Sequence, residues 1–229
     1  TYGKFFTYSL NPSYNIDFKE SENIKIFATL NSAFIAPSLY QLYDPYSGNK
    51  ELLPEESISK EIGIEINNQK RSLSIVLFER EENPKIIYEY DSSTFTGGYI
   101  NSPSDLTFRG VEIDYSKKFF NKMDFNFNYT FNELKRGTLQ RLPKHSFNES
   151  ITYYLKNNKQ LSFIYRYRGK REALGGTEIL NSYGLMDLRY SFSKDKIKFN
   201  FWINNIFNNE YVEILNYSSK GRNLRFGIS

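Results

Sequence analysis

Apolar and polar residues alternate along most of this chain with a period of two residues. The clearest run covers residues 123–131, and similar alternation covers residues 186–192 and 197–204. Because successive side chains of an extended strand point to opposite faces, this pattern predicts β-strands with one apolar and one polar face. In the clearest run the apolar positions are Met123, Phe125, Phe127, Tyr129 and Phe131, and the polar positions are Asp124, Asn126, Asn128 and Thr130.

Further strands are predicted throughout the chain, and no segment predicts a long helix. A weaker strand prediction covers about residues 4–17, because Pro12 lies inside that run and cannot donate to a strand ladder. The other predicted strands lie near residues 24–34, 58–66, 73–79, 111–116, 151–155 and 161–168.

The predicted connections alternate between short turns and long loops. Short, mostly charged turns are predicted at residues 19–22, 67–70, 120–122, 156–159 and 193–196. Long loops are predicted at about residues 35–56, 91–97, 133–144, 169–182 and 213–221, so ten connections join eleven strands. Tight turns at one end and long loops at the other are typical of an outer-membrane β-barrel. A soluble up-and-down sheet fits less well, because it rarely needs a strand as long as residues 98–118.

A membrane barrel also predicts which face of each strand is wet. We expect the even-numbered residues of 123–131 to face the lumen and the odd-numbered ones to face lipid, where an Arg at mid-bilayer costs about 2–4 kcal/mol. The polar face is too large for a packed sandwich core, and its charges fit a solvated or plugged interior. These predicted lumen charges are Glu61, Glu65, Glu112, Asp114, Arg166, Arg168, Asp187 and Arg189.

Composition agrees with this fold class. Aromatic residues make up 17% of the chain although its mean hydropathy is −0.58, a combination that a barrel with one lipid face and one wet face requires. No stretch approaches the roughly 20 apolar residues of a transmembrane helix. The net charge of +4 is spread over interspersed acids and bases, so no nucleic-acid footprint stands out. Cysteine is absent, which excludes disulfides and thiolate metal sites.

An odd number of strands leaves a sheet with two unpaired edges, which is an aggregation hazard in water and is forbidden in lipid. Eleven is half of 22, the strand number of plugged outer-membrane transporters. The start, Thr1-Tyr2-Gly3-Lys4, has no signal peptide. We therefore expect residues 1–229 to be the C-terminal part of a larger barrel that pairs with its own N-terminal half.

Catalysis has little support in the sequence, so no enzyme is predicted. His145 is the single histidine, and we expect it to be a solvated residue at a loop edge, since metal sites need several ligands. Glu55-Glu56 and Glu79-Arg80-Glu81-Glu82 contain adjacent acids, but neighbours on a strand point to opposite faces and cannot act as an acid/base pair. Gly175-Gly176 lacks the strand-loop-helix context of a phosphate-binding loop.

The best ligand candidates lie in the predicted loop 35–56. Tyrosine offers a rigid apolar face and a hydroxyl group, which suits a bulky amphipathic ligand, although these tyrosines could equally pack the loop or form an aromatic girdle. The candidates in this loop are Tyr40, Tyr43, Tyr46 and Asn49. Weaker candidates lie on or near the other long loops and are Arg136, Arg141, Arg171, Tyr217 and Arg222.

Several short motifs, in order, resemble the barrel of the TonB-dependent receptors, and the resemblance covers the chain from about residue 4 to its end. The motifs are Phe34-Ile35-Ala36-Pro37, Gly48-Asn49, Leu53-Pro54-Glu55-Glu56-Ser57, Glu61-Ile62-Gly63, Tyr99-Ile100-Asn101, Arg109-Gly110-Val111-Glu112, Arg141-Leu142-Pro143, residues 204–211 and Gly221-Arg222. Within the family, the compact interval from Tyr211 to Gly221-Arg222 is most similar to the cobalamin receptors. Family barrels end in an aromatic residue, whereas this chain ends in Gly227-Ile228-Ser229, so a few further residues are expected.

The resemblance implies energised import of a nutrient across the outer membrane. A plug in the lumen would respond to the inner-membrane TonB complex, and the extracellular loops would bind the small-molecule ligand, cobalamin or another corrinoid. A ferric siderophore or haem is the alternative ligand, and a passive porin or an autotransporter-type barrel is the alternative class. No cofactor is predicted, and calcium loops of enterobacterial cobalamin receptors would precede this segment. The expected partners are outer-membrane lipid, the N-terminal barrel half with its plug, and TonB, with no nucleic acid.

Overall fold

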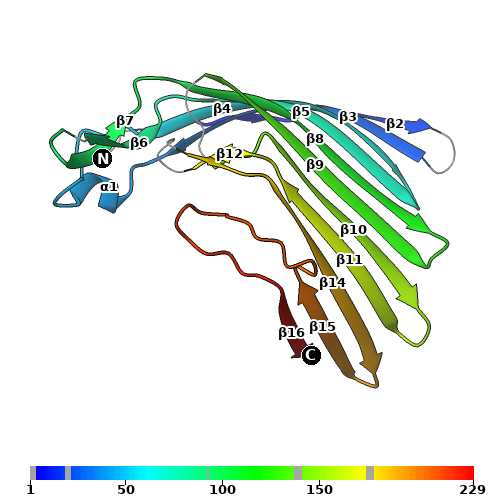
Figure 1. The fold of residues 1–229 in the computed structure, drawn as a ribbon. Helices are drawn as coiled ribbons and strands as arrows, with labels where there is room; N and C mark the ends of the chain where they lie inside the picture. Colours follow the sequence, from blue (N-terminus) through cyan, green and yellow to red (C-terminus); the bar gives the residue numbers. More distant parts are fainter. Residues whose placement is uncertain (1–3, 19–21, 92, 137–140, 174–177) are drawn as a thin grey trace.

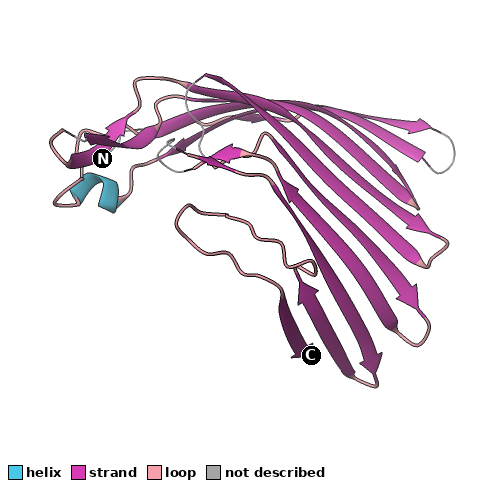
Figure 2. Ribbon diagram, viewed as in Figure 1, coloured by secondary structure: helices cyan, strands magenta, loops and turns pink. Residues whose placement is uncertain are grey.

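The computed structural model describes residues 4–18, 22–91, 93–136, 141–173 and 178–229, and almost all regular structure in them is β-strand (Figures 1 and 2). One continuous antiparallel sheet runs in the order β1/β2-β3-β4-β5-β8-β9-β10-β11-β14-β15-β16. Its strands are β1 (Ser9–Leu10), β2 (Ser13–Phe18), β3 (Glu22–Ile35), β4 (Glu55–Asn68), β5 (Arg71–Glu82), β8 (Leu106–Phe119), β9 (Met123–Arg136), β10 (His145–Leu155), β11 (Lys159–Arg168), β14 (Tyr183–Lys194), β15 (Ile197–Asn204) and β16 (Asn223–Ile228).

The all-β prediction is confirmed, and the twelve strands of the sheet correspond to the eleven predicted strands when β1 and β2 are counted as one. Strands β1 and β2 both pair with β3 and are separated only by Asn11 and Pro12, so together they form one interrupted strand. Proline has no N–H to donate, which explains the break at the position where the alternation was weak. The long β3–β5 and β8–β9 strands tilt across a strongly curved sheet (Figure 1).

The strand register separates an apolar face from a polar face. One row across β3, β4, β5, β8 and β9 consists of Ile24, Ile66, Leu73, Tyr115 and Phe127. The adjacent row on the opposite face consists of Lys25, Glu65, Ser74, Asp114 and Asn128. The same register places all eight predicted lumen charges on the polar face.

Aromatic rings cover much of the apolar face and contact one another between strands. Phe127 and Phe147 lie 6.0 Å apart between ring centroids, Phe192 and Phe199 lie 4.8 Å apart, and Phe201 lies close to Phe226 at 4.9 Å. Phe201 and Phe226 remain 42% and 57% exposed, so this face is not covered by protein among the described residues. An uncovered, ring-rich face suits contact with lipid hydrocarbon.

Glu149 is a charged residue within the central, otherwise apolar row of this face that contains Ile66 and Phe127. Its register partners are Phe127 on β9 and Tyr165 on β11, and it forms no ion pair with any described residue. The register therefore places one carboxylate within a band of aromatic and aliphatic side chains.

None of the helices formed by the described residues has the length and apolar character needed to cross a bilayer.

Short turns gather at one end of the sheet and long loops at the other, as predicted (Figure 1). Residues 19–21 of the first predicted turn lie outside the described residues, as do residues 137–140 and Gly175-Gly176 of two predicted loops. The long loops contain a helix, α1 (Leu39–Tyr43), and two hairpins. The hairpins are β6 (Ile86–Asp91) with β7 (Thr96–Asn101), and β12 (Arg171–Glu172) with β13 (Ile179–Leu180).

Three boundary predictions were wrong. A single strand was expected over residues 98–118, but β7 ends at Asn101 and β8 begins at Leu106, with Pro103 in the break. The loop expected at residues 91–97 is mainly the tip of the β6–β7 hairpin, and the loop before β16 spans residues 205–222 rather than 213–221. These differences enlarge the loop end, where the candidate ligand residues lie.

Gly110 permits a close approach inside the sheet. A Cβ atom at this position would meet the carbonyl oxygen of Phe131 on β9 and the ring of Phe78 on β5. Close packing therefore requires glycine at this position of the Arg109–Glu112 motif, because any side chain would force two neighbouring strands to shift.

Candidate ligand-binding loops

The first candidate loop is organised by helix α1. The Ser38 hydroxyl accepts a hydrogen bond from the Gln41 N–H at 3.2 Å, and the Gln41 side chain accepts one from the Ser38 N–H at 2.8 Å. This reciprocal capping box satisfies backbone donors that a helix N-terminus leaves free. Tyr40 and Tyr43 lie within this helix, and both are 61% exposed.

A small hydrophobic cluster anchors the loop to the β6–β7 hairpin. Leu42, Leu52 and Ile86 are buried, and the partly buried Tyr99 packs against them. The Tyr99 ring makes edge contacts with Tyr40, at 6.1 Å between centroids, and with Tyr88, at 5.2 Å. The buried cluster therefore holds in place the loop segment that carries the exposed tyrosines.

Polar side chains complete this junction. Asn49 donates from Nδ2 to the Tyr99 carbonyl at 3.0 Å, so its amide group is used in joining loop and hairpin. Asn101 accepts from the Leu53 N–H at 2.8 Å and donates to the Leu53 carbonyl at 3.0 Å. These bonds join residues from three of the short motifs found in the sequence.

Asp44 fixes the turn that follows α1. Its carboxylate accepts from the Ser47 hydroxyl at 2.7 Å and from the backbone N–H groups of Ser47 and Tyr46 at 2.9 and 3.2 Å. The hydroxyl bond from Ser47, helped by the backbone donors, holds the pKa of Asp44 below its usual range. Tyr46, which lies within this turn, is 92% exposed.

A second group of loops meets around Arg171. This side chain is only 9% exposed, donates to the carbonyls of Val212 and Glu213 at 3.0 and 3.3 Å, and lies over the Tyr183 ring. Arg141 joins the same group through its N–H, which donates to the Glu172 carbonyl at 2.8 Å. Arg171 thus connects the β12–β13 hairpin to loop 205–222.

The other predicted residues occupy different surroundings. Arg136 is ion-paired with Asp105 at 3.2 Å. Arg222 donates its N–H to the Asn208 side chain at 2.8 Å, and its guanidinium remains exposed. Tyr217 is 71% exposed at the tip of loop 205–222. The nine predicted residues therefore fall into a tyrosine-rich group on α1 and its turn, an arginine group near loop 205–222, and Arg136 beside Asp105.

A cavity of about 690 Å³ lies between loop 205–222 and the start of β14. Its lining includes Tyr183 and Tyr211, whose rings are 4.7 Å apart, together with Asn208 and Asn209. On the polar face of β14, Asp187 accepts from Arg166 at 2.7 Å and from the Asn205 N–H at 2.9 Å. The cavity volume is within the range of small-molecule sites, and the lining combines aromatic rings and amides with the carboxylates of Glu178 and Glu210.

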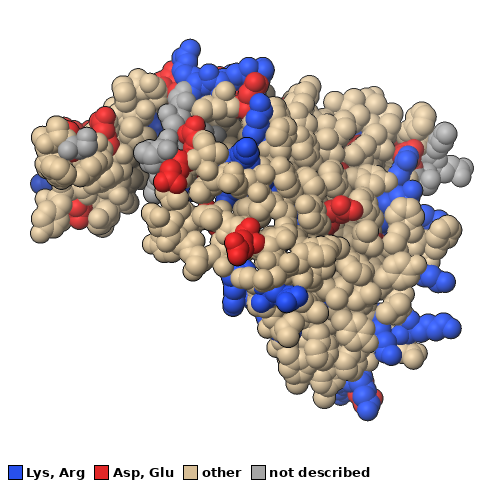
Figure 3. Space-filling model, in the orientation of Figure 1, with Lys and Arg blue, Asp and Glu red and all other residues tan. Residues whose placement is uncertain are grey.

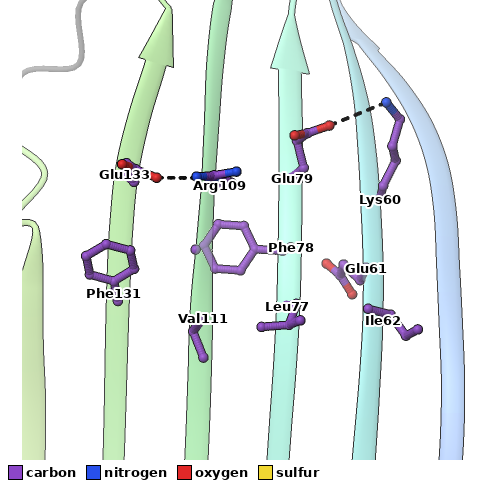
Figure 4. Close-up of a pocket in the computed structure, with 11 residues that line it drawn as sticks. Lys60, Glu61, Ile62, Leu77, Phe78, Glu79, Arg109, Val111, Phe131 and Glu133 are labelled. Carbon is purple, nitrogen blue, oxygen red and sulfur yellow. Dashed lines mark hydrogen bonds and ion pairs between the residues drawn. The ribbon is translucent and has the colours of Figure 1, made fainter.

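A second cavity, of about 520 Å³, lies elsewhere on the sheet (Figure 4). Most of its lining belongs to the apolar face, including Ile62, Leu77, Val111 and Phe131. It therefore faces lipid and does not belong to the ligand-binding loops. Among the described residues no cluster of three or more His, Asp or Glu side chains is arranged to hold a metal ion.

Comparison with known proteins decides the family. The family model described as "TonB dependent receptor-like, beta-barrel" matches residues 1–206. The chain belongs to this family. TonB-dependent receptors are outer-membrane β-barrels, which assigns the chain to the outer membrane, and the family consists of transporters and receptors rather than enzymes.

Two curated relatives of this TonB-dependent receptor chain carry the same name. It is 29% identical over 231 residues to "Vitamin B12 transporter BtuB" of Photobacterium profundum, covering 97% of this chain and 37% of the relative. It is 28% identical to the BtuB of Vibrio cholerae serotype O1, covering 85% of this chain and 33% of the relative. The chain therefore spans about a third of the length of the relatives it matches.

Solved structures support the fold. "Copper transporter OprC" superimposes with a TM-score of 0.80 at 16% identity, covering 94% of this chain and 38% of that chain. The siderophore receptor PirA from Acinetobacter baumannii superimposes with a TM-score of 0.73 at 17% identity, covering 95% of this chain and 40% of that chain. At these identities the similarity establishes the barrel fold of the receptor chain and leaves its ligand open.

Several loop residues of the receptor were not found by sequence reasoning. Tyr88 and Tyr99 belong to the β6–β7 hairpin, and Tyr183 and Tyr211 line the loop cavity. Tyr99 and Tyr211 stand inside motifs that were identified, but motif order alone does not indicate which loop a residue will contact. The capping-box spacing Ser38…Gln41 was a signal in the sequence for α1.

Proposed function

We propose that the receptor carrying this chain imports a corrinoid such as cobalamin across the outer membrane, energised by the TonB complex. Loop 36–54 with the β6–β7 hairpin contributes aromatic contacts, and loop 205–222 contributes polar ones. The observation that carries the proposal is the group of exposed tyrosines on a rigid base, in a chain whose curated relatives are named vitamin B12 transporters.

Ligand chemistry supports this choice. Corrinoids are broad rings with apolar edges and peripheral amides, so aromatic faces with hydroxyl tips complement both parts. Two of the four candidate arginines are already engaged, since Arg136 is paired with Asp105 and Arg171 is buried beneath loop 205–222. The exposed candidate surface is thus richer in tyrosine than in free cations, which favours an amide-rich ligand over an anionic one.

Ferric siderophores are the second candidate, since siderophore receptors such as PirA share the fold. An anionic ferric siderophore would need cationic groups, and Arg141 and Arg222 keep exposed positions among the candidates. A passive pore or an anchoring barrel would lack a plug. The complete gene distinguishes these, because a plug-encoding segment before the barrel excludes both.

We also propose that residues 1–229 form the C-terminal part of a larger barrel. The β1/β2 and β16 edges have no strand partner among the described residues, and such edges are not tolerated in lipid. Eleven strands would supply half of a 22-stranded barrel. The partners of this half would be the N-terminal strands, a plug and, through the plug, TonB.

The experiment is equilibrium binding of cobalamin to the purified intact receptor, with a ferric siderophore and haem as competitors. Replacing both Tyr43 and Tyr46 by Ala should weaken cobalamin binding by about 1–3 kcal/mol, as expected for lost aromatic contacts. The Phe double variant is the matched control, because it keeps the ring faces and removes only the hydroxyls. Reduced barrel yield with unchanged affinity would mean that these tyrosines only pack the loop. Tight siderophore binding without micromolar cobalamin binding would overturn the corrinoid assignment.

A further inference from the structure

The turn end of the sheet carries a repeated pair of lysines. Each of the β8–β9, β10–β11 and β14–β15 hairpins has one lysine on the apolar face at the strand end and one at or beside the turn. Figure 3 shows Lys and Arg side chains projecting along the edge formed by the hairpin turns. We call them the basic rim, which consists of Lys117, Lys122, Lys156, Lys159, Lys194 and Lys196.

The register fixes the direction of three members of the basic rim. Lys117 pairs with Phe125, Lys159 pairs with Phe192, and Lys194 pairs with Ile197, so all three share the face of the apolar band. They extend that band at its lower margin, where the sheet meets the turns. A lysine here can bury its stem along apolar surface while its ammonium group reaches a polar layer.

Aromatic rings lie directly beside the basic rim, one for each hairpin. They are Phe119, Tyr153 and Phe192, and the Lys117 ammonium lies 4.6 Å from the centroid of the Phe119 ring. Aromatic girdles mark the boundary between hydrocarbon and headgroups in membrane barrels. The rim lysines therefore lie at headgroup level, on the side of the short turns, which in such barrels is periplasmic.

The charges of the basic rim are not neutralised by the protein. None of its six lysines forms an ion pair with a carboxylate in the described part of the chain, and Asp195 is the single acid within the three turns. At the loop end of β8 and β9, Arg109 is paired with Glu133 at 2.9 Å, and at the loop end of the neighbouring β4 and β5, Lys60 is paired with Glu81 at 2.9 Å. Along these three hairpins the turn-side margin of the apolar band therefore keeps unpaired positive charge, whereas the turn ends of β3 and β5 are joined by the Arg71–Glu22 ion pair.

Spacing makes the rim act as one positive strip. Neighbouring strands are about 4.8 Å apart, so successive hairpins repeat about every 10 Å, which is comparable to the Debye length of about 8 Å at physiological ionic strength. The fields of adjacent lysine pairs overlap, and they do so at the depth of lipid phosphates. Anionic headgroups are attracted to such juxtamembrane basic segments.

We propose that the basic rim binds the phosphate groups of anionic phospholipids in the periplasmic leaflet, so that the receptor gathers these lipids around its turn end. This role is separate from the imported ligand, because the rim lies at the opposite end of the strands from the candidate loops. The exposed residues Tyr40, Tyr43 and Tyr46 take no part in this lipid binding.

The test uses the intact receptor in phosphatidylcholine nanodiscs that contain a small amount of spin-labelled phosphatidylglycerol or spin-labelled phosphatidylcholine. The immobilised fraction of each label gives its relative association with the barrel surface. We expect the wild type to prefer phosphatidylglycerol several-fold. The variant with all six rim lysines replaced by Gln should lose most of this preference, and the variant with all six replaced by Arg should keep it. Heat-modifiable mobility on gels confirms that each variant is folded.

A salt titration of the wild-type receptor tests the same claim without any variant. Raising ionic strength from about 0.01 M to about 1 M shortens the Debye length from about 30 Å to about 3 Å, and should remove the preference. The proposal is overturned if the two lipids associate equally with the wild type at low salt, or if the preference survives high salt or a folded Gln variant. Competition by lipopolysaccharide with no phosphatidylglycerol preference would also overturn it.

Discussion

Replacing a residue of β9 by Arg should affect the stability of the barrel differently on the two faces of the strand. Phe127→Arg places a guanidinium in the apolar row between Tyr115 and Glu149, whereas Asn126→Arg places it in the polar row between Ser116 and Ser150. The substitutions share the incoming side chain and differ by one position along the strand. They also differ in their cross-strand neighbours, because the new guanidinium of Phe127→Arg lies opposite the Glu149 carboxylate and can pair with it.

The structure gives the magnitude of the expected difference. An Arg on the lipid face near mid-bilayer costs about 2–4 kcal/mol. Losing the contact between Phe127 and Phe147, whose centroids lie 6.0 Å apart, adds about 0.5–1.5 kcal/mol. Asn126→Arg loses only a 3.3 Å hydrogen bond to Ser150, worth about 0.5–1.5 kcal/mol. Pairing with the Glu149 carboxylate on the neighbouring strand offsets about 0.2–1 kcal/mol of this cost, so Phe127→Arg should be the more destabilising by about 1–4 kcal/mol.

The assay is reversible folding of the intact receptor into lipid vesicles across a urea series, with the heat-modifiable band as readout. The midpoint for Phe127→Arg should fall well below that for Asn126→Arg, and the yield should fall with it. Equal midpoints, or a larger loss for Asn126→Arg, would refute the assignment of faces on which the lipid and lumen arguments depend.

Three further predictions use the same or simpler assays. Gly110→Ala should destabilise the barrel by about 1–3 kcal/mol through overpacking. Gly98→Ala is the control and should change stability by less than about 0.5 kcal/mol, because its Cβ would meet nothing nearer than 3.5 Å. Equal losses of stability would contradict the packing argument. Because the pKa of Asp44 is lowered in the folded loop, its stabilisation is present above the unfolded value of about 3.9 and is lost as pH falls through the folded value. Proteolysis of loop 36–54 should rise on acidification, and Asp44→Asn should flatten that pH dependence; an unchanged profile would argue against Asp44. Glu149→Leu should stabilise the folded barrel by about 1–2 kcal/mol, since a lipid-facing carboxylate is unfavourable, and a loss of stability would indicate a partner for Glu149.

Strand positions and faces were predictable because a membrane barrel repeats one physical rule along its length. Each of the predicted lumen charges, from Glu61 to Arg189, lies on the polar face for the same reason that Phe127 lies on the other. Alternation reports which side of a strand meets lipid, and it needs no knowledge of distant contacts. That rule fails at Glu149, which pattern reasoning passed over.

The structure of the loops depends on local and long-range contacts, and the alternation of apolar and polar residues does not report these contacts. Pro103 divides β7 from β8 although apolar residues continue on both sides, and α1 depends on a capping box that spans only four residues. The roles of Arg171 and Asn49 depend on partners that lie about 41 and 50 residues away in the sequence. Whether a loop residue is free to meet ligand could therefore be judged only once the loops were assembled. The ligand roles of the nine candidate residues remain predictions.

The most direct measurement of the central claim is uptake of radiolabelled cobalamin by bacterial cells that lack their own cobalamin receptor and express this intact receptor. The proposal predicts cobalamin accumulation that requires both the receptor and a functional TonB complex, and that is lost when TonB is deleted. Accumulation that persists without TonB would contradict energised import and support a passive pore. No cobalamin uptake, alongside TonB-dependent uptake of a ferric siderophore by the same cells, would contradict the corrinoid assignment.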